Sequence, residues 1–236
     1  VRTRCEVTAL TREGDVWRIA AGGEVFHARA VVNAAGPRVL DLLGRAGEPS
    51  AQKMRLVRGS HIVVRKLFDH DDAYFFQLPD GRIFFAIPYE RHYTLIGTTD
   101  VDHDKSLDKV EASAEEIAYL CDGASRYFSK TVTPADVVWT YSGVRPLVSD
   151  NSGKPGEATR GYRLELSGAG EGAPLLSVYG GKITTYRHLA EEAVDLMAAR
   201  LPALSGKAWT RQEALPGGDF AIDGLPALIA SLRQEF

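Results

Sequence analysis

The sequence predicts an α+β fold that consists mainly of antiparallel sheet packed by a few helices. Short runs of β-forming residues recur along most of the chain, and turns rich in glycine separate them. Apolar residues at helical spacing occur in only a few stretches. The chain has 236 residues, of which 44% are hydrophobic and 25% are charged. This length and composition suit one large globular domain or two small ones.

Residues 1–50 are expected to form a small antiparallel meander followed by a return strand. Runs of β-forming residues at 7–10, 16–19 and 24–26 are separated by glycine-containing turns. The return strand at 30–32 leads into Asn33-Ala-Ala-Gly-Pro37, where small side chains would let the backbone approach a ligand closely. Pro37 is then expected to open a short helix over residues 38–43. By composition alone, the same residues also fit an ordinary strand-to-helix turn.

Residues 51–174 are expected to form a largely antiparallel unit. Ser113 and Glu116 have the spacing of a capping box, which predicts a helix over residues 113–127. A strand that begins at residue 137 is expected to end at a turn around Gly143. The other strands are expected at 57–64, 73–77, 82–88, 93–97 and 162–166, with a loop at 151–157 and a glycine hairpin at 168–172.

Two side chains of this unit are candidates for chemistry. His61 lies in an apolar strand close to Gly59, a residue that indicates a bulge or the close approach of another group. A histidine here is either a packed core residue or a proton acceptor, since its ordinary pKa of ~6.5 suits proton transfer near neutrality. Arg145 follows the expected glycine turn and is either a surface ion pair or an anion-binding fork. Asp100 fits either a turn cap or a carboxylate that orients a basic group, and the turn cap is favoured. A solvated face is favoured over contact with anionic lipid headgroups for the basic residues near His61, which are Lys53, Arg55, Arg58, Arg65 and Lys66.

A glycine pair organises residues 175–210. The apolar strand at 175–179 is followed by Gly180 and Gly181 and then by helical periodicity up to about residue 201. Such a turn gathers backbone N–H groups beside a helix N-terminus, which suits an anion or a cofactor. Lys182 follows the turn, and Thr184 and Thr185 are expected to cap the helix. The alternative is a plain strand-to-helix connection with a solvated lysine. Residues 211–236 are expected to contain a linker and a further apolar helix over 222–232.

Charge and cysteine content argue against several classes of protein. The net charge of −3 gives no electrostatic reason to expect nucleic-acid binding. Cys5 and Cys121 lack the spacing of metal ligands or of a disulfide framework, and they fit a reducing cytoplasm. No role is assigned to His70 or His103, which lie in acidic loops.

Taken together, these motifs resemble those of the quinone-linked, FAD-dependent glycerol-3-phosphate dehydrogenases. The matching stretches follow the order of that family and cover most of the chain. They are VVNAAGP (31–37), RGSHIVV (58–64), IGTTD (96–100), VWTYSGVRPL (138–147), SVYGGKITTYR (177–187) and ALPGG (214–218).

The resemblance implies oxidation of glycerol 3-phosphate to dihydroxyacetone phosphate with FAD as the cofactor and quinone as the electron acceptor. It implies that His61 accepts the hydroxyl proton and that Arg145 and Lys182 bind the substrate. It also implies FAD-binding parts at 1–50 and 175–210, a substrate-binding domain at 51–174 and the start of a C-terminal helical domain at 211–236. The cofactor contacts that it implies are Val7, Ala35, Gly36, Gly180, Gly181, Lys182, Ile183 and Thr184.

One feature of such enzymes is missing from this sequence. A GxGxxG turn between a strand and a helix normally holds the pyrophosphate of the cofactor, whereas the nearest match, at 168–172, precedes Pro174 and another strand. We therefore expect a fragment that has neither activity nor bound FAD by itself. For the intact protein we expect peripheral contact with the inner face of the cytoplasmic membrane, with a homodimer as one candidate state. The alternatives are a flavin-dependent amino-acid or amine oxidase, a glycerol-phosphate oxidase and a non-catalytic binding module.

Overall fold

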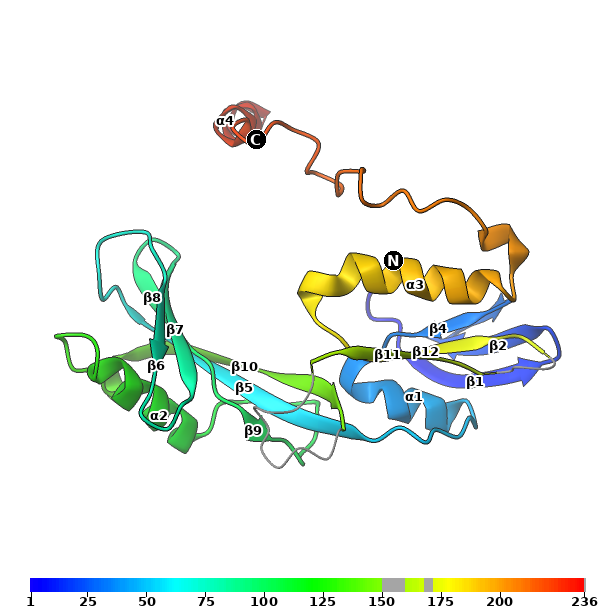
Figure 1. The fold of residues 1–236 in the computed structure, drawn as a ribbon, viewed down its shortest axis with the longest axis horizontal. Helices are drawn as coiled ribbons and strands as arrows, with labels where there is room; N and C mark the ends of the chain where they lie inside the picture. The colour runs from blue at the N-terminus through cyan, green and yellow to red at the C-terminus, as the bar shows by residue number, and fades with distance from the viewer. Residues whose placement is uncertain (150–159, 168–171, 236) are drawn as a thin grey trace. The chain divides into compact units, whose positions relative to one another are not determined.

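An antiparallel meander opens the chain in the computed structural model, which describes residues 1–149, 160–167 and 172–235. Strands β1 (Val7–Glu13), β2 (Val16–Ala21) and β3 (Glu24–Ala28) pair in that order, as the turn-separated runs predict (Figure 1). Figure 1 also shows the fold to be mixed, with sheets joined by few helices. The predicted α+β class is therefore confirmed.

The predicted return strand belongs to a second sheet. Strand β4 (Val31–Asn33) pairs parallel with β12 (Leu175–Gly180), and β12 pairs antiparallel with β11 (Tyr162–Ser167). The strand predicted at 162–166 therefore pairs with the one predicted at 175–179. The predicted hairpin at 168–172 lies largely outside the described residues, and the predicted loop at 151–157 lies wholly outside them.

A hydrophobic core joins these two sheets to a short helix. The 3-10 turn η1 (Gly36–Arg38) and helix α1 (Val39–Arg45) follow β4, close to the helix predicted at 38–43. Trp17 is fully buried, and its indole N–H donates to the carbonyl of Ala173 at 3.1 Å. Val39, Leu175 and Tyr179 pack in the same core. This arrangement fixes the residues that follow β4 and β12, where the cofactor contacts are predicted.

The largest described sheet contains both candidate side chains. Its order is β10 (Val137–Val148), β5 (Met54–Arg65), β8 (Tyr93–Gly97), β7 (Ile83–Tyr89) and β6 (Tyr74–Gln77), and β9 (Val101–Asp102) also pairs with β5. All these pairs are antiparallel. The meander predicted at 73–97 is confirmed.

Helix α2 (Ala114–Ser125) covers one face of this sheet. Leu120 and Cys121 pack against Ile62 and Ile96 in a buried cluster. Ser113 accepts a hydrogen bond from the backbone N–H of Glu116, and the Glu116 carboxylate accepts one from the backbone N–H of Ser113. The predicted capping box is confirmed, and it fixes the start of the helix.

The strand that contains Arg145 does not end where the glycine suggested. Strand β10 continues through Gly143, which pairs with Gly59 of β5, and ends only at Val148. The predicted turn around Gly143 is therefore wrong. At its other end, the strand is preceded by the short 3-10 turn η2 (Pro134–Asp136).

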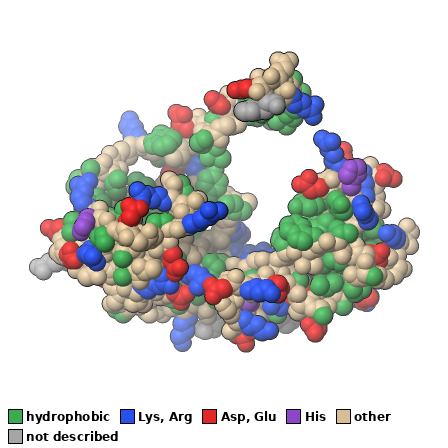
Figure 2. Space-filling view, turned by 180° about the vertical axis from the view of Figure 1, so that it is seen from behind, with side chains coloured by type: hydrophobic (Ala, Val, Ile, Leu, Met, Phe, Trp, Pro, Cys, Tyr) green, Lys and Arg blue, Asp and Glu red, His purple; other side chains and the backbone are tan. Residues whose placement is uncertain are grey.

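The face of the sheet that α2 leaves uncovered is rich in aromatic side chains. One row of register partners crosses five strands in the order Phe75, Phe85, Gly97, His61, Tyr141. Since partners in one register row point to the same face, His61 lies among rings. Phe75, Phe85 and Tyr141 are exposed, and Figure 2 shows hydrophobic side chains gathered on the surface of this part of the molecule. We call this surface the open face.

The described chain divides into two compact units, Val1–Lys182 and Ile183–Phe236. The second contains η4 (Ile183–Thr185), α3 (Tyr186–Ala198), η5 (Pro202–Leu204) and α4 (Leu225–Glu235). Helices α3 and α4 correspond to those predicted up to about 201 and over 222–232. The division into four parts stays a prediction. Among the described residues, none of the helices is long and apolar enough to cross a bilayer.

Candidate active site

His61 projects from the middle of β5 onto the open face. Its ring stacks on that of Tyr141, with 4.8 Å between the ring centroids and an angle of 8° between the planes. On the neighbouring strand it lies over Gly97, where an added Cβ atom would overlap the imidazole. The imidazole is therefore held between the ring of Tyr141 on β10 and the backbone of Gly97 on β8.

The surroundings of His61 favour the neutral imidazole. Burial lowers its pKa from the ordinary value of 6.5, and the positive charge of Arg145 lowers the pKa further. The Nδ1 atom is buried and has no hydrogen-bond partner among the described residues. A neutral imidazole near pH 7 can accept a proton.

Arg145 lies on the same face, since it is an even number of residues from Tyr141 on the same strand. Its guanidinium donates to Asp100 Oδ1 at 2.9 Å, to Thr98 Oγ1 at 3.0 Å and to the carbonyl of Thr99 at 3.4 Å. These contacts to the turn after β8 fix the plane of the guanidinium. The interpretation of Asp100 as a turn cap is thus corrected: its carboxylate orients a basic group.

The absence of a side chain at Gly59 leaves room for the guanidinium of Arg145, as its absence at Gly97 does for the ring of His61. A Cβ atom added to Gly59 would overlap the guanidinium of Arg145. The close approach that Gly59 indicated is confirmed, whereas the register between β5 and β10 shows no bulge at this position. Gly143, the register partner of Gly59, has nothing within 4 Å of an added Cβ atom. Only one glycine of this pair is therefore required by a neighbouring side chain.

The predicted glycine turn lies at the end of β12. Gly180 has φ +70° and Gly181 has φ +104°, values that residues with a side chain rarely adopt. A Cβ atom on Gly180 would lie 2.6 Å from the carbonyl oxygen of Gly161 and 3.5 Å from that of Pro146, the residue after Arg145. The turn therefore approaches β10 next to the candidate arginine, and Lys182 follows directly, with an exposed side chain.

The helix after this turn begins without the predicted cap. Thr185 is the N-cap residue of α3, yet its side chain makes no capping hydrogen bond, and its ψ of 8° lies outside the extended region that a capping side chain needs. Thr184 falls inside η4. The expectation that these threonines cap the helix is therefore wrong. Ile183 and Thr184 are both exposed.

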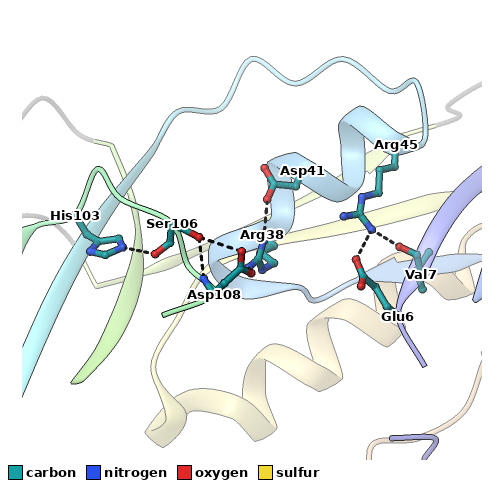
Figure 3. Close-up of polar contacts among 8 residues, drawn as sticks. All are labelled: Glu6, Val7, Arg38, Asp41, Arg45, His103, Ser106 and Asp108. Carbon is teal, nitrogen blue, oxygen red and sulfur yellow. Dashed lines mark hydrogen bonds and ion pairs between the residues drawn. The ribbon is translucent and has the colours of Figure 1, made fainter. Parts of the chain in front are cut away.

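Two of the predicted cofactor contacts share a cavity in the first unit. Val7 and Ala35 line a hollow of about 380 Å³, with Arg38 and Arg45 beside them. Arg45 donates to Glu6 and to the carbonyl of Val7, and Arg38 contacts Asp41 and Asp108, as Figure 3 shows. Gly36, the next predicted contact, has φ +56° and open space in the direction of an added Cβ atom.

A buried polar cluster behind the sheet was not predicted. Glu116 is only 5% exposed, and its carboxylate contacts Arg58 Nη2 at 2.7 Å. Arg58 therefore does not belong to the solvated face that we expected, and Arg55 pairs with Asp102. The capping-box pattern located Glu116 but gave no sign of its long-range partners.

The two histidines without an assigned role differ in burial. His103 is buried, and its Nε2 lies 3.2 Å from the carbonyl oxygen of Ser106 (Figure 3). His70 is exposed beside Tyr74. Within the described part of the chain, no group of three or more His, Cys, Asp or Glu side chains could hold a metal ion.

The chain is similar to known flavoproteins over most of its length. The model of the FAD dependent oxidoreductase (DAO) family matches residues 1–187. D-erythritol 1-phosphate dehydrogenase of Brucella abortus is 40% identical over 243 residues, which are 100% of this chain and 48% of that protein. The aerobic glycerol-3-phosphate dehydrogenase of Escherichia coli is 41% identical over 231 residues, which are 95% of this chain and 46% of that protein.

Solved structures agree with this assignment. A glycerol-3-phosphate dehydrogenase from Bacillus halodurans, complexed with FAD, aligns with a TM-score of 0.82 at 29% identity and covers 98% of this chain and 45% of its own. The amino acid oxidase NikD aligns at 21% identity with a TM-score of 0.56, covering 76% of this chain and 46% of its own, which shows a shared fold alone. The chain spans about half the length of the curated relatives that it matches. It belongs to the family of FAD dependent oxidoreductases.

Proposed function

We propose that the whole protein oxidises the secondary alcohol of glycerol 3-phosphate to give dihydroxyacetone phosphate. The observation that carries this proposal is the pairing, on one open sheet face, of a neutral imidazole with an arginine fixed by three contacts. Alcohol oxidation needs a proton acceptor, and a phosphorylated substrate needs cationic donors. The similarity to glycerol-3-phosphate dehydrogenases supports the same substrate.

Each residue has a defined task in this proposal. FAD, when bound, would supply the acceptor for the hydride of the carbinol carbon. His61 accepts the hydroxyl proton at Nε2, because Nδ1 is buried. The guanidinium of Arg145 and the ammonium of Lys182 bind the phosphate or the developing alkoxide, where a planar fork and a point charge complement each other.

The residues around the described hollow fit part of the cofactor. Val7 and Ala35 line this concave surface, and Gly36 follows Ala35. Arg38 and Arg45 also line it, together with their carboxylate partners Glu6, Asp41 and Asp108. Small residues let the backbone approach a dinucleotide closely. We propose that these residues contact the adenosine diphosphate part of FAD, and that Gly180, Gly181, Lys182, Ile183 and Thr184 contact its ring end.

The direct test is a substrate panel with the purified whole protein. We expect flavin reduction by glycerol 3-phosphate and none by glycerol, since the phosphate contacts would be lost. Reduction by amino acids with release of peroxide would favour an amino-acid oxidase and overturn the proposal.

A four-carbon substrate is a second candidate. The D-erythritol 1-phosphate dehydrogenase of Brucella abortus is as similar to this chain as the glycerol-3-phosphate dehydrogenases are. Both substrates are phosphorylated polyols, so the same imidazole and the same cations would serve either. The ratio of kcat/KM for D-erythritol 1-phosphate to that for glycerol 3-phosphate decides between the two candidates.

We further propose that a membrane quinone, and not oxygen, accepts the electrons. The whole protein would then contact the inner face of the cytoplasmic membrane peripherally, and a homodimer is the candidate oligomeric state. Reduction of a soluble quinone analogue without peroxide release is expected. Rapid oxidation of the reduced flavin by oxygen would instead favour a glycerol-phosphate oxidase. Sedimentation of the whole protein measures its oligomeric state.

Residues 1–236 expressed alone are expected to contain no stoichiometric flavin. The GxGxxG turn that holds a pyrophosphate does not occur in this sequence, so the contacts at Val7, Ala35 and Gly36 would act without it. The measurement is the absorption spectrum of the purified segment. A yellow segment with one flavin per chain would contradict this expectation.

The activity of the whole protein is expected to fall at low pH with a midpoint below 6.5. Burial and Arg145 both lower the pKa of His61 from that value, so the base form persists to lower pH than in a free histidine. Replacing Arg145 by alanine removes one of the two causes and is expected to raise the midpoint. Profiles of kcat/KM against pH for the two proteins check the sign, and a downward shift would contradict it.

Gly59→Ala is expected to raise the KM of the whole protein about tenfold or more without unfolding it. A rise of this size is typical when one charge-assisted contact is lost. An added methyl group would displace the end of a flexible side chain, Arg145, and would leave the backbone in place. Gly143→Ala is the matched control, because it changes the register partner of Gly59 where space is open. Equal kinetics in the two variants would contradict the claim that Arg145 depends on the space above Gly59.

A further inference from the structure

We propose that Glu116 positions Arg145 for the substrate from the opposite face of the sheet, acting through Thr99. The inference rests on the proposed function, because it assigns a role to a residue that would not touch substrate or cofactor. It names a positioning residue for the same site.

The carboxylate of Glu116 lies at the centre of the buried cluster. Its Oε1 accepts from Thr99 Oγ1 at 2.6 Å and from Ser60 Oγ at 2.8 Å. Its Oε2 accepts from the backbone N–H of Ser113 at 2.9 Å and contacts Arg58 Nη2 at 2.7 Å. Burial opposes ionisation of this carboxyl group, yet these hydrogen bonds hold its pKa below the ordinary value. A buried carboxylate with four partners of this kind is rigidly placed.

Thr99 connects this cluster to the open face. It is 2% exposed, and its hydroxyl also accepts a hydrogen bond from the backbone N–H of Ser60 at 2.9 Å. The residues on either side of it, Thr98 and Asp100, each accept a hydrogen bond from Arg145. The carboxylate therefore fixes the middle residue of the three that hold the guanidinium.

The two ends of this connection belong to opposite faces. Ser60 and His61 are neighbours on β5 and so point to opposite faces of the sheet. Ser142, whose hydroxyl lies 2.8 Å from that of Ser60, and Arg145 are likewise an odd number of positions apart on β10. Helix α2 thus contributes to the geometry of a site that it does not reach.

A capping role alone does not require this arrangement. The capping box needs only Oε2 of Glu116 and the Ser113 side chain, whereas Oε1 is committed to Thr99 and Ser60. The two roles use different oxygen atoms, so substitutions at Thr99 separate them.

The test is a double-substitution cycle in the FAD-loaded whole protein with glycerol 3-phosphate. Thr99→Val removes the hydroxyl but keeps the shape, and it leaves the pair of Glu116 with Arg58 intact. We expect kcat/KM to fall at least fivefold, mainly through KM. In an Arg145→Ala background the same substitution is expected to change kcat/KM less than twofold, because the group through which it acts is gone.

Further variants distinguish positioning from general damage. Thr99→Ser keeps the hydroxyl and is expected to restore most of the lost kcat/KM. Glu116→Gln also removes the charge that pairs with Arg58, so it is expected to lower kcat/KM at least as much as Thr99→Val and to lower the melting temperature as well. Glu115→Gln, at its exposed neighbour on α2, is expected to leave the kinetics unchanged. Thermal denaturation and flavin content report whether each variant is folded.

The outcomes separate this inference from the proposed function. A fivefold loss that is equally large with and without Arg145 would overturn the inference, as would wild-type kinetics in both Thr99→Val and Glu116→Gln. A wild-type protein that oxidises no phosphorylated polyol would overturn the proposed function instead.

Discussion

His61→Ala in the whole protein is expected to lower kcat for glycerol 3-phosphate by about 10²- to 10⁴-fold, the range typical of general base catalysis. The imidazole is held neutral by burial and by Arg145, and it is fixed between Tyr141 and Gly97. Removal of the proton acceptor affects the transition state more than substrate binding, so KM should change far less than kcat. Steady-state kinetics above the acid limb of the pH profile measure the effect.

His70→Ala is a suitable control for this substitution. His70 is exposed and contacts Tyr74 outside the row of partners that contains His61, so its loss should leave kcat unchanged. A His61 variant with altered KM and normal kcat would mean that the ring packs against the substrate or binds its phosphate, and that another group accepts the proton.

The local patterns in the sequence were sufficient to predict most elements of the fold. Ser113 and Glu116 located the start of α2 because a capping box involves residues three apart. The strand-forming runs and the turns between them located β6, β7 and β8, because strand and turn preferences also act over a few neighbouring residues. Gly143 misled because glycine weakens strands in general, although here it pairs with Gly59 inside a long ladder.

The seating of the candidate side chains could not be predicted in the same way. His61 and Arg145 were recognised by residue type and by resemblance, but the glycines beneath them depend on which strands pair and in which register. Asp100 was interpreted as a turn cap and Arg58 as part of a solvated face, because the sequence does not identify partners that are distant along the chain. Long-range pairing is set by tertiary packing, which local propensity does not encode.

Arg145→Ala and Lys182→Ala are each expected to lower kcat/KM at least tenfold. Loss of one charge-assisted contact to a bound phosphate costs about 1.5–3 kcal/mol, and about 1.4 kcal/mol corresponds to a factor of ten. Arg145→Lys should recover little, since an ammonium cannot reproduce the planar contacts to Thr98 and Asp100. Lys66→Ala serves as a control at an exposed lysine of the same charge.

The two cations should differ in their effect on stability. Arg145 is the partner of Asp100, whose side chain is 23% exposed, so Arg145→Ala leaves a half-buried carboxylate without its closest positive charge. A lower melting temperature is therefore expected for that variant, and Arg145→Ala combined with Asp100→Asn should recover part of the loss without restoring activity. Lys182 follows a turn fixed by Gly180 and Gly181, and its side chain is exposed. Since contacts of exposed charges contribute little to stability, Lys182→Ala should lower the melting temperature less than Arg145→Ala does. Near-wild-type kcat/KM in both single variants would show that neither Arg145 nor Lys182 binds the phosphate, because a folding defect could only lower kcat/KM.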